Sequence, residues 1–217
     1  MDGAAQGATG RAIADQLRDE ILTGVLTPGT RIGQQPIAER FDASRIPVRE
    51  GLKLLESEGL VTIVPNSGAW VSRLDLAEFV QIYKLREQVE SFALQESMGS
   101  LELDQVAQLS RLVDEISSST DVEDFLRLDR EFHLLTYAGA RFPLLHELVL
   151  RFWNSTQHYR RAWAQARHEE RHWATDAEHG LIVDAIKRLD RETAGSLVRA
   201  HIRRTRLALT ARPDLFA

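Results

Sequence analysis

The chain has 217 residues, of which 43% are apolar and 27% charged, a composition typical of a soluble globular protein with one or two domains. It contains no cysteine, which excludes disulfide scaffolds, iron–sulfur clusters, cysteine zinc fingers and thiol nucleophiles. We find no secretory signal and no apolar run near the ~18 residues of a membrane span, so we expect a cytoplasmic protein without membrane contact. The formal net charge of −5 is spread over both halves, so binding to nucleic acid has to depend on where a few arginines lie.

The first 75 residues contain a series of short predicted elements. Residues 1–10 are rich in glycine and alanine and are predicted to form a disordered tail. Apolar periodicity and turn residues then predict, in chain order, helices over 11–24, 36–41 and 44–58 and strands over 60–64 and 69–73. Three helices followed by a hairpin are typical of a winged helix-turn-helix, so we expect a DNA-binding domain over residues 11–73.

The character of the sequence changes after residue 75. Nearly all of it follows a helical period with few glycines, and no alternating strand pattern appears. The expected helices span 76–98, 102–117, 121–139, 143–168, 172–189 and 191–211. We therefore expect a mainly α fold, in which an all-α helical bundle over residues 76–213 follows the winged helix-turn-helix.

The third predicted helix separates into an apolar face and a basic face. At 100° per residue, Arg45, Arg49 and Lys53 fall within about 80° of one another, opposite the apolar side chains. Arginine near the start of a helix in the major groove can donate paired hydrogen bonds to guanine, and a helix that begins at Ser44 suits a backbone phosphate. An ordinary amphipathic helix with solvated cations would show the same pattern, but the order of the elements favours DNA binding.

Residues 11–73 resemble the N-terminal domain of the GntR family of bacterial winged-helix transcription regulators. The strongest matches are Ser-Arg-Ile-Pro-Val-Arg-Glu at 44–50 and Leu-Glu-Ser-Glu-Gly-Leu-Val at 55–61. The resemblance implies that the two arginines of the first segment contact DNA and that the wing glycine approaches the minor groove. The residues expected to bind DNA are Gln35, Ser44, Arg45, Arg49 and Gly68.

Three positions depart from the family pattern within this match. Ile46 stands where threonine is common, Gly51 where alanine is common, and Gln34-Gln35 where a charged residue often helps to read bases. We expect these departures to affect which operator sequence is recognised more than whether the protein binds DNA.

Polar residues interrupt the apolar stripes of three bundle helices. Asp129 and His133 lie one turn apart on one stripe, and His179 and His201 lie on the stripes of the last two helices. A buried carboxylate needs a partner, and imidazole and carboxylate groups that converge in a bundle core can hold a divalent metal. The alternative is that the four side chains bond to one another in the core without a metal.

The same helices resemble the FCD domain, the ligand-sensing bundle of the FadR-type branch of the GntR family. The matching segments are Asp-Arg-Glu-Phe-His at 129–133, Glu-His at 178–179 and Ala-His at 200–201. The resemblance implies that the aspartate and three histidines named above hold a divalent metal ion, with zinc and nickel as the expected identities. Ala140 stands where asparagine is common. We expect this difference to affect the shape of the neighbouring loop and not the metal ligands.

A small organic acid is the expected effector of such a site. Four protein ligands leave one or two positions open on a metal that prefers five or six, and a carboxylate can fill them. Arg86 lies on the apolar face of the helix over 76–98 and is the predicted second contact, because a planar guanidinium can bind a carboxylate through two hydrogen bonds. The alternative for Arg86 is an internal ion pair with Glu90, one turn further along.

A zinc-peptidase pattern offers an alternative function. Residues 168–172 are His-Glu-Glu-Arg-His, in which the two histidines would hold zinc and Glu169 would act as the base of a hydrolase. The charged surroundings of this segment and the lack of a predicted sheet in the bundle argue against it. Glu178 also stands where a third histidine ligand would be expected. We therefore expect that the protein is not an enzyme.

Together these features predict a metabolite-responsive transcription regulator. The resemblance to the family implies a repressor, since repression is the commoner sense there, while the residues themselves leave repression and activation open. It is expected to bind a palindromic DNA operator as a homodimer, because one small winged helix provides too little specificity alone. Effector binding at the metal is expected to change the spacing of the two DNA-binding domains and so the affinity for DNA.

Overall fold

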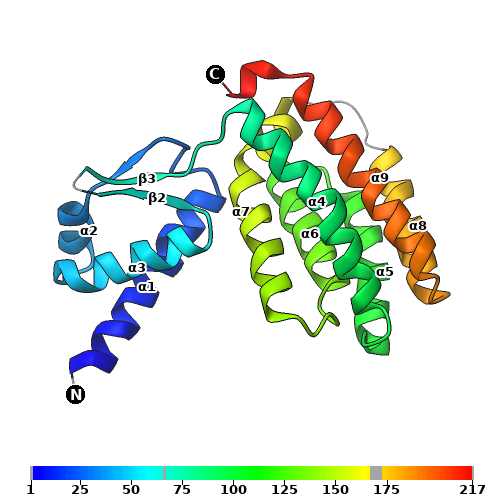
Figure 1. The fold of residues 1–217 in the computed structure, drawn as a ribbon, viewed down its shortest axis with the longest axis horizontal. Helices are drawn as coiled ribbons and strands as arrows, with labels where there is room; N and C mark the ends of the chain where they lie inside the picture. The colour runs from blue at the N-terminus through cyan, green and yellow to red at the C-terminus, as the bar shows by residue number, and fades with distance from the viewer. Residues whose placement is uncertain (1, 66, 167–172, 217) are drawn as a thin grey trace. The chain divides into compact units, whose positions relative to one another are not determined.

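The structure is a computed structural model that describes residues 2–65, 67–166 and 173–216 (Figure 1). It divides into two compact units, one of Met1–Leu74 with Trp153–His158 and the other of Asp75–Phe152 with Tyr159–Ala217. We call the first the winged-helix unit and the second the helical bundle. Among the described helices, none combines the length and the apolar character needed to cross a membrane.

Helices and a small sheet make up the winged-helix unit. Its elements are α1 (Asp2–Leu22), β1 (Arg31–Ile32), α2 (Gln34–Arg40), α3 (Arg45–Ser57), β2 (Val61–Val64) and β3 (Gly68–Val71). The strands form an antiparallel sheet with β3 in the centre, where Trp70 pairs with Arg31 on one side and with Thr62 on the other. The hairpin of β2 and β3 is the wing of a winged helix-turn-helix.

A single apolar core holds this unit together. The buried side chains come from α1, α3 and the sheet, and they include Ile13, Leu17, Val48, Leu52, Leu55, Val61, Ala69 and Val71. On the helices these residues form the apolar stripe that the period of the sequence predicts. Burial of this apolar stripe stabilises the unit. Because the stripe of α3 faces the core, the opposite face of the helix is exposed to solvent.

Helices α1 and α3 approach each other closely at Gly51. A Cβ atom at this position would lie 2.7 Å from the carbonyl oxygen of Gly10 and 3.4 Å from the backbone nitrogen of Ala14. Both are backbone atoms that cannot rotate away, so α3 needs a glycine here. This gives a physical reason for the departure from the alanine that is common in similar sequences.

Two local features of the winged-helix unit differ from the sequence-based expectation. Helix α1 begins at Asp2, whereas residues 1–10 were predicted to be a disordered tail. Three alanines and the absence of proline in this stretch favour the helix. Strand β1 was not predicted, because two residues are too few to show alternation and only the pairing with β3 defines the strand.

The helical bundle is built from six described helices and a terminal turn. They are α4 (Leu76–Ser97), α5 (Leu103–Ser118), α6 (Val122–Thr136), α7 (Pro143–Ala166), α8 (Trp173–Lys187), α9 (Arg191–Thr210) and the 3₁₀ turn Pro213–Phe216. Within α7, residues Trp153–His158 are counted with the winged-helix unit. Side-chain caps mark several starts: Asp75 and Glu78 form a capping box on α4, and Asp121 and Asp190 cap α6 and α9. Helix α4 packs along α9, and α5 packs against α6 and α8 (Figure 1). The mainly α fold class is confirmed.

Candidate functional site

The basic face of α3 is exposed to solvent. Arg45, Arg49 and Lys53 are all exposed, while Val48 and Leu52 on the opposite side are buried. A helix that enters a major groove needs this arrangement, because its apolar face must stay in the core while its polar face meets the bases.

Two more predicted residues, Gln35 of α2 and Ser44, lie next to the first residues of α3. The Nε atom of Arg45 donates a hydrogen bond to Oε1 of Gln35 at 3.0 Å, and the Gln35 amide donates to Glu39 at 2.7 Å. Ser44 occupies the N-cap position but makes no side-chain capping bond, so the first N–H groups of α3 have no side-chain cap. Uncapped N–H groups at a helix start can donate to a DNA phosphate.

A basic residue that sequence reasoning missed, Arg31 of β1, lies beside the wing. Gly68 has a φ of +138°, in the region that favours glycine, and a Cβ atom there would lie 3.5 Å from Nε of Arg31. The Arg31 guanidinium donates to the carbonyl of Ser67 at 3.2 Å and lies 5.9 Å from the ring centroid of Trp70. No sequence signal marks Arg31, because its position beside the wing depends on the pairing of β1 with β3.

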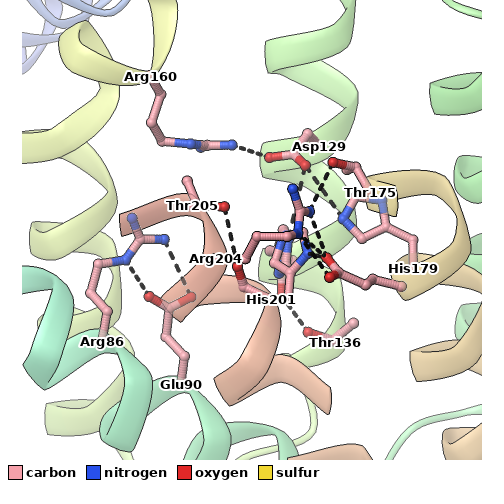
Figure 2. A network of polar contacts seen from close by, with 12 residues as sticks. Arg86, Glu90, Asp129, Thr136, Arg160, Thr175, His179, His201, Arg204 and Thr205 are labelled. Atoms are coloured by element: carbon pink, nitrogen blue, oxygen red, sulfur yellow. Dashed lines mark hydrogen bonds and ion pairs between the residues drawn. The ribbon is translucent and has the colours of Figure 1, made fainter. Parts of the chain in front are cut away.

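The predicted polar residues of the bundle converge in its core. Asp129 and His133 come from α6, His179 from α8 and His201 from α9, and all four are buried. One ligand atom from each lies within 4.8 Å of the ligand atoms of the others. The Oδ1 atom of Asp129 is 3.5 Å from Nε2 of His179 and 3.9 Å from Nε2 of His133. This cluster can hold a metal ion; three of its members are labelled in Figure 2.

The hydrogen bonding of two histidines fits a metal. The side chain of His179 is 0% exposed, and neither ring nitrogen has a hydrogen-bond partner among the described residues. Leaving a buried polar group unsatisfied costs about 1–3 kcal/mol, which coordination to an ion would remove. His201 donates from Nδ1 to Glu178 at 2.7 Å, which leaves its Nε2 atom for coordination.

The charges of the cluster also suit a cation. Burial by itself raises the pKa of Asp129, but the charge of Arg160, which donates to Oδ2, and the nearby imidazoles outweigh it and bring the pKa below its usual value. Burial lowers the pKa of His133 well below its usual value, and burial together with His201 lowers that of His179 to about 3. The cluster therefore presents a carboxylate at Asp129 and neutral imidazoles at His133 and His179, which are the forms that bind metals.

A small pocket lies beside Asp129. Its lining residues are Phe125, Leu126, Asp129, Arg160, Trp163, Thr175, His201 and Thr205. Arg160 of α7 was not predicted as a site residue, because its proximity to Asp129 depends on how α7 packs against α6. The paired side chains of Arg160 and Asp129 and two threonines lie on its walls, so the pocket suits a polar ligand.

Arg86 makes the internal ion pair that the sequence analysis kept as an alternative. It is 3% exposed, and its Nε atom lies 2.5 Å from Oε1 of Glu90 (Figure 2). In the described part of the chain, Arg86 is not among the residues that line the pocket beside Asp129. The predicted effector contact of Arg86 thus stays a prediction. The zinc-peptidase pattern at residues 168–172 lies outside the described residues.

Comparisons with known proteins match two successive parts of the chain. The model of the gntR family of bacterial regulatory proteins matches residues 9–71, and that of the FCD domain matches residues 81–204. An uncharacterized helix-turn-helix transcriptional regulator from an unstable DNA locus of Streptomyces ambofaciens is 34% identical over 201 residues, covering 89% of this chain and 81% of the relative. The gluconate operon transcriptional repressor of Bacillus licheniformis is 30% identical over 154 residues, covering 69% of this chain and 61% of the relative.

A solved structure shares the fold. The E. coli McbR/YncC structure superposes with a TM-score of 0.80 at 22% identity, over 94% of this chain and 97% of that one. The named relatives are transcription regulators, so the alternative of a zinc-dependent hydrolase has no support among them. The chain belongs to the GntR family, in its FadR-type branch with a C-terminal FCD domain, and it is a DNA-binding transcription regulator rather than an enzyme.

Proposed function

We propose that this regulator is metabolite-responsive, and that its helical bundle binds a divalent metal ion together with a small organic acid. The observation that carries the proposal is the convergence of Asp129, His133, His179 and His201 in a buried cluster, where His179 has no hydrogen bond within the described chain. Three imidazole nitrogens and one carboxylate oxygen suit zinc or nickel. When bound, the ion would act as a Lewis acid that attracts an anionic ligand.

The pocket beside Asp129 supports an organic acid as the effector. Arg160 lines this pocket with Thr175 and Thr205, so a carboxylate there would meet a cation and two hydroxyl groups. We assign the acid's carboxylate to Arg160 rather than to Arg86, because Arg160 lines this pocket and Arg86 is not among its described lining residues. One relative is named for the operon of gluconate, a sugar acid, and is a repressor, which supports both the class of effector and repression.

DNA recognition is assigned to the residues on the exposed face of the winged-helix unit. Arg45 and Arg49 would donate to base edges from α3, with Gln35 orienting Arg45 through their 3.0 Å hydrogen bond. Ser44 would contact a phosphate, and Gly68 would let the wing approach the minor groove. A homodimer on a palindromic operator would supply the specificity that one such unit lacks.

The test is operator binding with and without the two ligands. Operator fragments are first selected from the source genome with the purified protein, and their affinity is then measured by fluorescence anisotropy at fixed salt. We expect the affinity to change only when zinc or nickel and an acid from a panel of small carboxylates are both present.

Two variants on α6 make this test specific. Asp129→Asn should remove the response to the acid, while Asp124→Asn, which changes an exposed carboxylate on the same helix, should keep it. The proposal is contradicted if the operator affinity is the same with every combination of metal and acid. It is also contradicted if Asp129→Asn still responds to the acid.

A further inference from the structure

We propose that Tyr137 is a positioning residue of the metal site, which fixes the ring of His133 by bridging it to Glu90. The inference rests on the metal site proposed above, and it adds a residue that does not itself contact the ion. Tyr137 follows the last residue of α6, and its side chain is buried.

The three side chains form one chain of hydrogen bonds. The hydroxyl oxygen of Tyr137 lies 3.3 Å from Nδ1 of His133 and 2.8 Å from Oε2 of Glu90. Glu90 in turn accepts from Nε of Arg86 at 2.5 Å, so the chain ends on a charged pair of α4. All four residues are buried, which shields these contacts from water.

The direction of the bonds follows from which groups can donate. A carboxylate only accepts, so the Tyr137 hydroxyl must give its proton to Glu90. Its oxygen is then left to accept from Nδ1–H of His133. In a neutral imidazole only one nitrogen carries hydrogen, so the Nε2 atom keeps its lone pair. That nitrogen is the one that faces Oδ1 of Asp129, at 3.9 Å.

His201 is held by a similar but shorter chain of hydrogen bonds. Its Nδ1 atom donates directly to Glu178, which also accepts from Arg204. Both histidines are thus anchored through Nδ1 to a carboxylate that an arginine holds, with Tyr137 as an additional link for His133. Outer groups of this kind orient metal-binding imidazoles, and their removal typically costs 10–100-fold in metal affinity.

The first experiment compares two conservative variants in a zinc titration. Zinc affinity is measured by competition with a chromogenic chelator for the full-length parent, Tyr137→Phe and Tyr83→Phe. Tyr83 is the matched control, because it is equally buried and its hydroxyl has no hydrogen-bond partner in the described chain. We expect zinc binding to weaken about 10–100-fold in Tyr137→Phe and to stay unchanged in Tyr83→Phe.

A double-mutant cycle separates positioning from a general loss of structure. In a His133→Ala background, Tyr137→Phe should cause no further loss of zinc affinity, because the ring it orients is gone. If Tyr137→Phe weakens zinc binding equally in both backgrounds, or not at all in the parent, the inference is wrong.

The metal-free protein gives an independent readout. With isotope-labelled histidines, NMR should show the hydrogen of His133 on Nδ1 in the parent and a changed tautomer in Tyr137→Phe. An unchanged tautomer would overturn the positioning role. If the parent binds no zinc, the proposed metal site fails, and the tautomer measurement still decides what Tyr137 does.

Discussion

The winged-helix unit and the helical bundle carry their polar residues in opposite places. In the first, Arg45 and Arg49 lie on the solvent side of a helix whose other side fills the core. In the second, Asp129 and His179 lie where apolar side chains would be expected, at 2% and 0% exposure. The exposed arginines follow the amphipathic pattern of α3. The buried cluster departs from the amphipathic pattern of its own helices, because polar residues stand there on apolar faces.

This difference has a consequence for how the two units respond to change. An exposed arginine contributes little to the stability of the fold, so its loss should affect DNA binding alone. A buried carboxylate or imidazole is part of the core, so its loss changes both ligand binding and stability.

Replacing Arg49 with alanine should weaken operator binding with no change in the melting temperature. Each paired contact to a base is worth about 1–3 kcal/mol, so two copies in a dimer amount to roughly a 30-fold loss or more. Anisotropy with the selected operator and a circular dichroism melt measure the two quantities. Arg111→Ala, which removes an exposed arginine of α5, should bind the operator as tightly as the parent does. An equal loss of affinity in both variants would show that Arg49 contributes only its positive charge.

Removing the metal should destabilise the parent. Zinc present at 100 times its Kd adds about 2.7 kcal/mol of stability, and for a chain of this size that corresponds to a melting temperature about 5–10 °C higher. We expect a chelator to cancel this shift in the parent and in Asp124→Asn. Asp129→Asn should melt at the same temperature with zinc or with chelator, and a zinc shift that persists there would place the ion elsewhere.

Alanine should have opposite effects at two helical glycines, one in each unit. At Gly51 it meets the Gly10 carbonyl 2.7 Å away, so Gly51→Ala should lower the free energy of unfolding by about 1–3 kcal/mol. At Gly180 of α8 a Cβ atom has nothing within 4 Å, so Gly180→Ala should raise it by up to about 1 kcal/mol. Urea denaturation measures both changes. A stabilising Gly51→Ala would show that α1 and α3 can separate at no cost.

Much of this architecture could be predicted from the sequence, because periodicity reports which side of a helix is buried. The same periodicity placed Asp129, His133, His179 and His201 on inward stripes, and the resemblance to the FCD domain supplied the ligand role. The pair of Arg86 with Glu90 was also predictable, since residues four apart on a helix are neighbours.

The rest depends on contacts between elements distant in the sequence. Arg160 reaches Asp129 from α7, and Tyr137 reaches Glu90 across 47 residues, and no local pattern encodes either contact. Strand β1 exists only because β3 lies beside it. Helix α1 begins earlier than the sequence predicted, because residues 1–10 are rich in glycine and alanine and have no apolar period that would mark a helix.

The most direct test of this account is the metal content of the full-length protein, purified without chelator, incubated with zinc and washed. Elemental analysis should find about one equivalent per chain in the parent and none in an Asp129→Ala, His133→Ala double variant whose folding is checked by circular dichroism. A parent that retains no metal, or a folded double variant that retains as much as the parent, would contradict the metal site on which the proposed sensing depends.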